Sequence, residues 1–76
     1  MSRPLTSLAP GEEAQISKIH AAEALYHRLT ALGFRSGRPI RLLRRAAFRG
    51  PLHIRIGSTD VIIRASDARC IELVAI

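Results

Sequence analysis

The chain has 76 residues, of which 47% are hydrophobic, and its 12 basic and 6 acidic residues give a formal net charge of +6. This length excludes more than one domain and allows only a small core. The single cysteine, Cys70, excludes an internal disulfide and suits a reducing compartment. No run of residues resembles a signal peptide or approaches the ~20 apolar residues of a membrane span, so we expect a cytoplasmic protein.

Five short runs with apolar residues on alternate positions, bounded by glycine and proline, predict β-strands. They cover residues 13–19, 39–45, 52–56, 61–64 and 71–73. The third run gives the cleanest signal, because its leucine and isoleucines alternate regularly with His53 and Arg55. Several short strands joined by turns favour a small barrel or sandwich, so the fold class we predict is mainly β.

One amphipathic helix is predicted between the first two strands, over residues 21–32. Three leucines at spacings of four and three share one face of it and would pack on the core. They are Leu25, Leu29 and Leu32. Gly33 is then suited to a left-handed helix cap, and Phe34 stands where such a cap places an apolar residue against the last turn.

Arginine supplies nearly all of the positive charge, and no acid stands between Glu23 and Asp60. Strict alternation along the second and third strands would turn Arg41, Arg45 and Arg55 outward together. Guanidinium groups suit carboxylates and phosphates. An acidic protein surface, a nucleic acid or an anionic membrane could each be the partner, and a merely solvated arginine-rich surface is the alternative.

No catalytic or cofactor-binding constellation is evident in the sequence. The three histidines fall on three different elements, and the lone cysteine has no partner at a zinc-ligand spacing. No glycine-rich phosphate loop is present. We therefore predict neither an enzyme, nor a cofactor, nor a resident metal. His27 or His53 with a nearby carboxylate is the one surface metal site left open.

An ordered set of short motifs runs from about Leu5 to the end of the chain. In order these are Arg28-Leu29, Leu32-Gly33-Phe34, Gly37, Ile40, Phe48, Gly50-Pro51-Leu52, Gly57, Val61-Ile62-Ile63-Arg64, Asp67-Ala68 and Ile71. With these gaps the chain resembles the FeoA family, small cytoplasmic partners of the bacterial ferrous-iron transporter FeoB. Ala47 and Arg49 depart from the family pattern, which has a proline and a glycine there.

The resemblance implies an SH3-like β-barrel of about five strands with one helix inserted after the first strand, covering residues 1–76 as a single domain. It also implies an accessory protein of ferrous iron transport that acts by binding FeoB, through its cytoplasmic GTPase portion. On this reading the chain reaches a membrane only through that partner.

We expect the partner contacts to lie on or beside the second and third strands. The candidate residues are Arg41, Leu43, Arg44, Arg45, Phe48, Arg49, His53 and Arg55. Leu43, if it faces outward, and Phe48, at a loop tip, are the candidate apolar anchors among the charges. The alternative for Phe48 is that its ring folds back and closes the barrel.

Two other functions stay open at this point. A basic small barrel could bind nucleic acid, but three scattered aromatic residues do not make a stacking platform, so we expect no stable nucleic-acid binding. A free-standing relative of the SH3-like domain of iron-dependent repressors would instead bind a repressor or a peptide.

Overall fold

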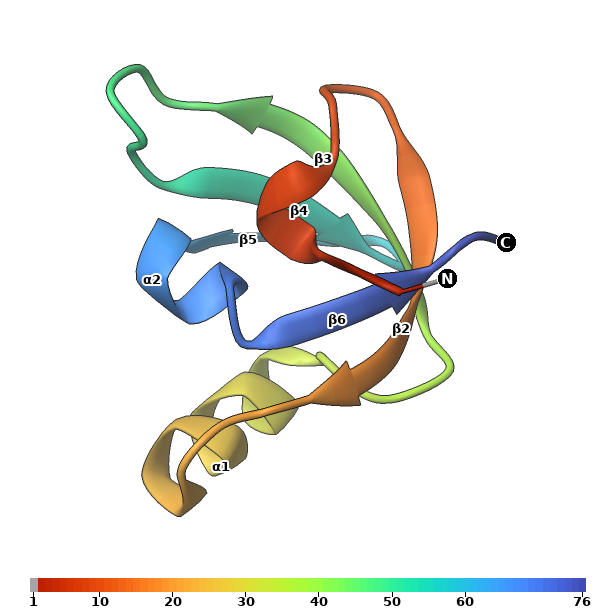
Figure 1. Ribbon diagram of the computed structural model, residues 1–76, viewed down its shortest axis with the longest axis vertical. Helices are drawn as coiled ribbons and strands as arrows, with labels where there is room; N and C mark the ends of the chain where they lie inside the picture. Colours follow the sequence, from red (N-terminus) through yellow and green to blue (C-terminus); the bar gives the residue numbers. More distant parts are fainter. Residues whose placement is uncertain (1) are drawn as a thin grey trace.

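The computed structural model describes residues 2–76, which form one curved antiparallel sheet with a helix at one end (Figure 1). The strand order in this sheet is β1-β6-β2-β3-β4-β5. The strands are β1 (Arg3–Pro4), β2 (Glu13–Ile19), β3 (Pro39–Arg45), β4 (Leu52–Ile56), β5 (Thr59–Ile63) and β6 (Ile71–Val74). The helical segments are η1 (Leu5–Ser7), α1 (Glu23–Leu32) and α2 (Ala65–Ala68). The mainly β fold with an inserted helix is therefore confirmed.

The strands predicted from alternation are all present, and the bounds of β2, β3 and β4 agree with the sequence pattern. The pattern missed β1, because a strand of two residues is too short to show alternation. This strand pairs with β6 at Leu73 and Glu72. Just after this strand, the chain buries Leu5 and Leu8 completely. The start of the chain is thus held to the core by two leucines rather than by a long strand.

The core lies inside the curve of the sheet and consists of aliphatic side chains from the inward positions of the strands. Its strand members are Ala14, Ile16, Ile40, Leu42, Leu52, Ile54, Ile56, Ile63, Ile71 and Leu73. Among residues 2–76, no polar or charged residue is buried. The side chains of the core are therefore stabilised by the burial of apolar surface, and the charged side chains lie at the surface.

The helix α1 packs on this core through a narrower face than the sequence predicted. Leu29 is fully buried and Leu25 is partly buried against the core, but Leu32 is 40% exposed, so its predicted burial is wrong. The predicted cap is confirmed. Gly33 has a φ of 109°, and Phe34 N–H donates to Leu29 O at 3.0 Å. Phe34 is completely buried beneath this cap.

Two β-bulges break the alternation that the sequence suggested. One lies between Ile16 and Lys18 in β2. In β3 the register passes from Leu42 to Arg44, which leaves Leu43 as the extra residue. Arg45 consequently lies opposite the buried Leu52. The expectation that Arg45 shares an outward face with the arginines at 41 and 55 is therefore wrong.

Candidate partner-binding surface

A row of four charged side chains crosses the outer face of the sheet from β2 to β5. Glu13 lies opposite Arg41, and Arg41 lies opposite Arg55. Arg55 in turn lies opposite Asp60 and donates to it from Nε at 2.8 Å and from Nη2 at 3.2 Å. Arg41 Nη2 is 3.9 Å from Glu13 Oε1. The interval of the sequence that lacks acids therefore does not produce a surface without acids. Glu13 and Asp60, which lie outside that interval, stand at the two ends of the row.

The Arg55–Asp60 pair fixes the charges at one end of this row. The hydrogen bond from Arg55 holds the pKa of Asp60 below its ordinary value. The same bond raises the pKa of Arg55. His53 Nε2 lies 3.7 Å from Asp60 Oδ2, so a protonated His53 would share the carboxylate with Arg55. Both members of the ion pair thus stay charged near neutral pH.

Two apolar side chains lie on either side of His53 beside the charged row. Ile62 is 67% exposed and lies opposite His53 across β4 and β5. Leu43 is half-buried at the bulge of β3, next to Arg44, which also lies opposite His53. We call Leu43, His53 and Ile62 the outer band.

Sequence reasoning missed Ile62. It stands in a run of three β-branched residues, Val61 to Ile63, and such a run does not show which member faces outward. The hairpin that joins β4 and β5 is what determines that Ile62 faces outward. The turn at Gly57-Ser58 fixes the register of β4 and β5, and that register places Ile62 opposite the outward His53.

The loop between β3 and β4 projects from the end of the sheet (Figure 1), and Phe48 lies midway along this loop in the sequence. Phe48 is fully exposed, at 101%, so the alternative in which its ring closes the barrel is wrong. Phe48 and Arg49 both have a φ of 58°. This left-handed conformation favours glycine, which is the residue that the family pattern has at position 49.

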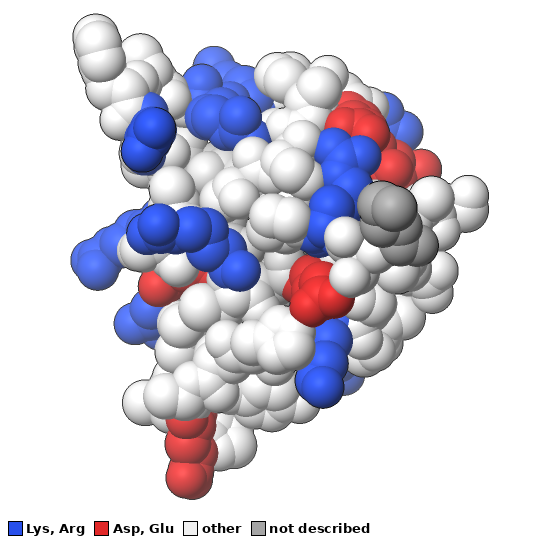
Figure 2. Space-filling model, viewed as in Figure 1, with Lys and Arg blue, Asp and Glu red and all other residues white. Residues whose placement is uncertain are grey.

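Basic side chains gather around this loop and α2, on the left of the space-filling view (Figure 2). A pocket of about 690 Å³ opens there, and no acid is among the residues that line it. Its lining is Thr6, Arg45, Arg49, Gly50, Pro51, Leu52, Arg64, Ala65, Ser66 and Arg69. Arg64 and Arg69 were not among the predicted contact residues, because they lie outside the acid-free interval of the sequence.

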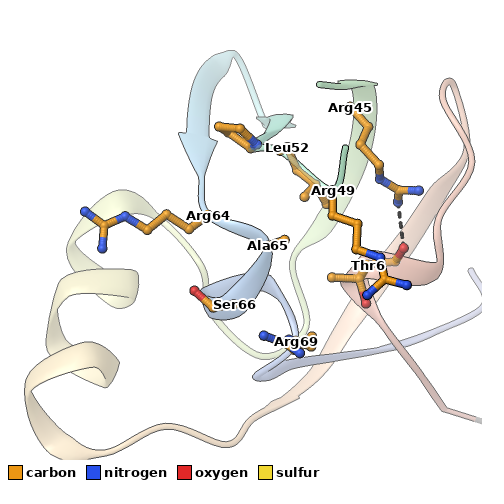
Figure 3. Close-up of a pocket in the computed structure, with 10 residues that line it drawn as sticks. Thr6, Arg45, Arg49, Leu52, Arg64, Ala65, Ser66 and Arg69 are labelled. Carbon is orange, nitrogen blue, oxygen red and sulfur yellow. Dashed lines mark hydrogen bonds between the residues drawn. The ribbon is translucent and has the colours of Figure 1, made fainter. Parts of the chain in front are cut away.

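The four arginines of this pocket differ in how they are held. Arg45 Nη2 donates to Thr6 O at 2.6 Å and to Leu8 O at 2.9 Å, so it ties the start of the chain to β3 (Figure 3). Arg49 extends from the loop toward Thr6, whereas Arg64 points away from both. The guanidinium groups of the pocket thus do not point to one centre, and Arg45 is the one that is hydrogen-bonded to the backbone.

The structure distributes the eight predicted contact residues over two neighbouring surfaces. Those on the outer face of the sheet are Arg41, Leu43, Arg44, His53 and Arg55. Those at the β3–β4 loop and its pocket are Arg45, Phe48 and Arg49.

No three His, Cys, Asp or Glu side chains within residues 2–76 are grouped so as to hold a metal ion. The two histidines considered from the sequence each approach one carboxylate. His27 Nε2 is 3.7 Å from Glu23 Oε1, and His53 has the contact with Asp60 described above. In the same part of the chain, no helix has the length and apolar character needed to cross a membrane.

The FeoA domain model matches residues 3–75 of the sequence. The chain belongs to the FeoA domain family. This family is associated with ferrous iron transport and is a non-enzymatic accessory domain. The resemblance seen in the motifs is therefore confirmed, and so is the prediction that the chain is not an enzyme. No curated protein matches the chain.

Solved structures agree with this assignment. The crystal structure of an iron uptake regulatory protein, FeoA, is 23% identical, with a TM-score of 0.85 over 96% of this chain and 95% of that one. A zinc complex of Stenotrophomonas maltophilia FeoA, a prokaryotic SH3 domain protein, is 27% identical, with a TM-score of 0.80 over 93% and 88%. The SH3-like fold is thus confirmed.

The fold also occurs inside a larger protein. A manganese-dependent transcriptional repressor is 22% identical, with a TM-score of 0.90 over 99% of this FeoA-family chain. The chain spans only 42% of that repressor. At this identity the likeness concerns the fold alone.

Proposed function

We propose that this FeoA-family chain is an accessory protein of bacterial ferrous iron transport that acts by binding the cytoplasmic GTPase portion of FeoB. Family membership over residues 3–75 supports the link to ferrous iron transport. The S. maltophilia relative is itself proposed to activate ferrous iron transport. Because the family is non-enzymatic, the chain acts by binding. It does so in the cytoplasm, beside the transporter.

The observation that carries the proposal is the exposed outer band. Ile62 leaves two thirds of its surface in water although the residues on either side of it pack inward, and Leu43 adds half-buried apolar surface two strands away, with β4 and its His53 between them. Protein interfaces have an apolar centre surrounded by a polar rim. Here the rim is the charged row, so the band has the layout of a small docking site.

The net charge of the chain predicts how the contact responds to salt. Opposite charges across an interface raise the association rate and fix orientation more than they add affinity. The charged row is itself balanced, with two arginines and two acids, so the expectation of an acidic face on the partner rests on the net charge of +6 of the whole chain. Added salt should therefore slow association, because exposed charges are screened beyond about 10 Å at 0.1 M salt.

One pair of substitutions tests the proposed docking site. Ile62→Asp places a charge in the outer band, whereas Ile76→Asp makes the same change at the exposed end of the chain, where Ile76 is 72% exposed. We expect Ile62→Asp to weaken binding to the cytoplasmic portion of FeoB about 30-fold, as a central contact would. Isothermal titration calorimetry measures the affinity of both variants for the FeoB portion at one salt concentration.

The control variant should bind like the original chain. Both variants should stay folded, with Ile62→Asp melting slightly lower because aspartate is unfavourable within a strand. Equal affinities for the two variants would show that the outer band is not the docking site. An original chain that does not bind the FeoB portion at all would remove the proposed function itself.

A further inference from the structure

We propose that the β3–β4 loop and the arginines beside it bind an anionic phospholipid surface, with the Phe48 ring inserted among the headgroups. The sequence suggested that the chain reaches a membrane only through its partner, whereas this contact would be direct. It involves a different surface from the outer band. It therefore does not depend on the proposed function.

Phe48 is held in water by the shape of the loop. Phe48 and Arg49 occupy successive left-handed positions, which side chains of this size rarely adopt. The backbone is tight on both sides of the tip, since Gly50 N–H donates to Ala47 O at 3.1 Å and Ala46 N–H to Pro51 O at 3.0 Å. A loop that fixes a bare aromatic ring outward is suited to the interface between headgroups and acyl chains.

The acidic residues of the chain are all engaged away from this loop. Each of the six lies within ion-pair distance of a basic side chain outside the pocket lining. The pairs are Glu12 with Arg3, Glu13 with Arg41, Glu23 with His27, Asp60 with Arg55, Asp67 with Arg28, and Glu72 with His20. Asp67 is the acid nearest in sequence to the pocket arginines. Only 19% of its side chain is exposed, and it accepts from Arg28 at 3.0 Å.

The arginines around the tip are left with an uncompensated charge. Within residues 2–76, no ion pair or side-chain hydrogen bond is formed by Arg44, Arg49, Arg64 or Arg69. Three of them line the pocket and the fourth precedes the loop. More unpaired arginines thus lie near the exposed ring than at the other end of β3, where Arg35 and Arg38 are, and this gathering of positive charge suits a negatively charged lipid surface.

The arrangement fits lipid better than protein or nucleic acid. Arg64 points away from Arg45 and Arg49, so the guanidinium groups do not converge on one rigid ligand (Figure 3). Mobile headgroup phosphates can meet each guanidinium separately. A protein partner would need a wider apolar centre than one ring. A nucleic acid would need further aromatic platforms, and the pocket lining has no aromatic residue.

A single tryptophan provides the most direct test, because the natural sequence has none. Phe48→Trp places the reporter at the loop tip, and Tyr26→Trp places it on α1, where Tyr26 is 44% exposed. The probes are vesicles of phosphatidylcholine alone and of phosphatidylcholine mixed equally with phosphatidylglycerol. We expect the tryptophan emission of the loop variant to shift to the blue only with the anionic vesicles, and that of the helix variant not to shift. An unshifted loop variant, or an equal shift with both vesicles, would overturn the proposal.

Charge reversal tests whether the position of the arginines matters. Arg49→Glu with Arg69→Glu alters the pocket, whereas Arg35→Glu with Arg38→Glu makes the same charge change at the other end of β3, where these arginines likewise make no ion pair within residues 2–76. Each basic residue near an anionic surface contributes about a fivefold gain in binding. In vesicle sedimentation, we expect the pocket variant to bind at least about 25-fold more weakly and the control to bind nearly normally.

Two results would contradict this account. Equal losses in the two charge variants would mean that only net charge attracts the chain to lipid. A single-stranded oligonucleotide that shifts the emission of the Phe48→Trp variant and displaces the vesicles would assign the surface to nucleic acid. Because the vesicles contain no protein, neither result bears on whether the chain binds FeoB.

Discussion

At the scale of single residues, Arg49 adopts a backbone conformation that is unfavourable for a residue with a Cβ. The FeoA pattern has glycine at this position, and the structure puts Arg49 at a φ of 58°. A left-handed residue with a Cβ costs about 1–2 kcal/mol relative to the right-handed form. The neighbouring Gly50 has a different reason to be glycine, because a Cβ there would lie 2.7 Å from Ala46 Cβ.

These two positions should respond to substitution in opposite directions. We expect Arg49→Gly to raise the free energy of unfolding by about 1 kcal/mol, since it removes the left-handed strain. Gly50→Ala should lower it, because Ala46 must move to accept the new methyl group. Urea unfolding of both variants measures the difference. A loss of stability in Arg49→Gly would show that the arginine side chain itself supports the loop.

Glu12 makes a second prediction at this scale. Its carboxylate accepts from Arg3 at 2.8 and 3.1 Å and from Ala9 N–H at 2.9 Å. These bonds hold the pKa of Glu12 below its ordinary value, with Arg3 as the largest cause. A carboxyl group with a lowered folded-state pKa stabilises the fold above its unfolded pKa, and that contribution is lost as the pH falls through the folded value.

The stability of the chain should therefore decline as the pH falls below about 4, the range in which unfolded glutamate is protonated. Glu12→Gln should make this decline in stability less steep, because the variant has no carboxylate at position 12 whose stabilising contribution is lost on protonation. Thermal melting between neutral and acid pH compares the two proteins. Identical acid profiles would mean that the Arg3–Glu12 pair does not hold the start of the chain.

At the scale of elements, sequence reasoning succeeded where side-chain period and burial agree. The run from Leu52 to Ile56 alternates without a break, and β4 has those bounds. Gly33 and Phe34 formed a recognisable cap because only a few residues suit those positions. Alternation failed at Leu43, since a bulge is set by the pairing of two strands and has no pattern within one of them.

The helix α1 gives a test with an internal control. Leu29 is 1% exposed at the centre of the helix–sheet contact, whereas Leu32 is 40% exposed one turn later. Leu29→Ala should cost about 2–5 kcal/mol, from lost burial and the cavity that remains. Leu32→Ala should cost much less. Chemical denaturation measures both, and equal losses would show that α1 packs differently from the structure described here.

At the scale of the whole molecule, part of the site could be foreseen and part could not. The arginine-rich interval was visible in the sequence, and Phe48 was placed correctly at a loop tip. The outer band was only half visible, because Ile62 becomes exposed through the register of β4 and β5. The pocket arginines at 64 and 69 join Arg45 and Arg49 only when the curved sheet brings α2 beside the β3–β4 loop.

The fold also redistributes the charge that the sequence appeared to concentrate on one face. Arg41 and Arg55 are matched by Glu13 and Asp60 from neighbouring strands. Of the arginines that form no ion pair within residues 2–76, Arg44, Arg49, Arg64 and Arg69 lie at the loop and the pocket, and Arg35 and Arg38 lie at the other end of β3. The two proposed contacts therefore divide the molecule, with an apolar band for a protein partner and a basic tip for a lipid surface.

The measurement that tests the central claim most directly is a chemical-shift map of the isotope-labelled chain titrated with the unlabelled cytoplasmic portion of FeoB. Our account predicts that the amide signals of Leu43, His53 and Ile62 shift or broaden most, and that signals of α1 change little. A map centred on α1, or a spectrum left unchanged at saturating partner concentration, would contradict it.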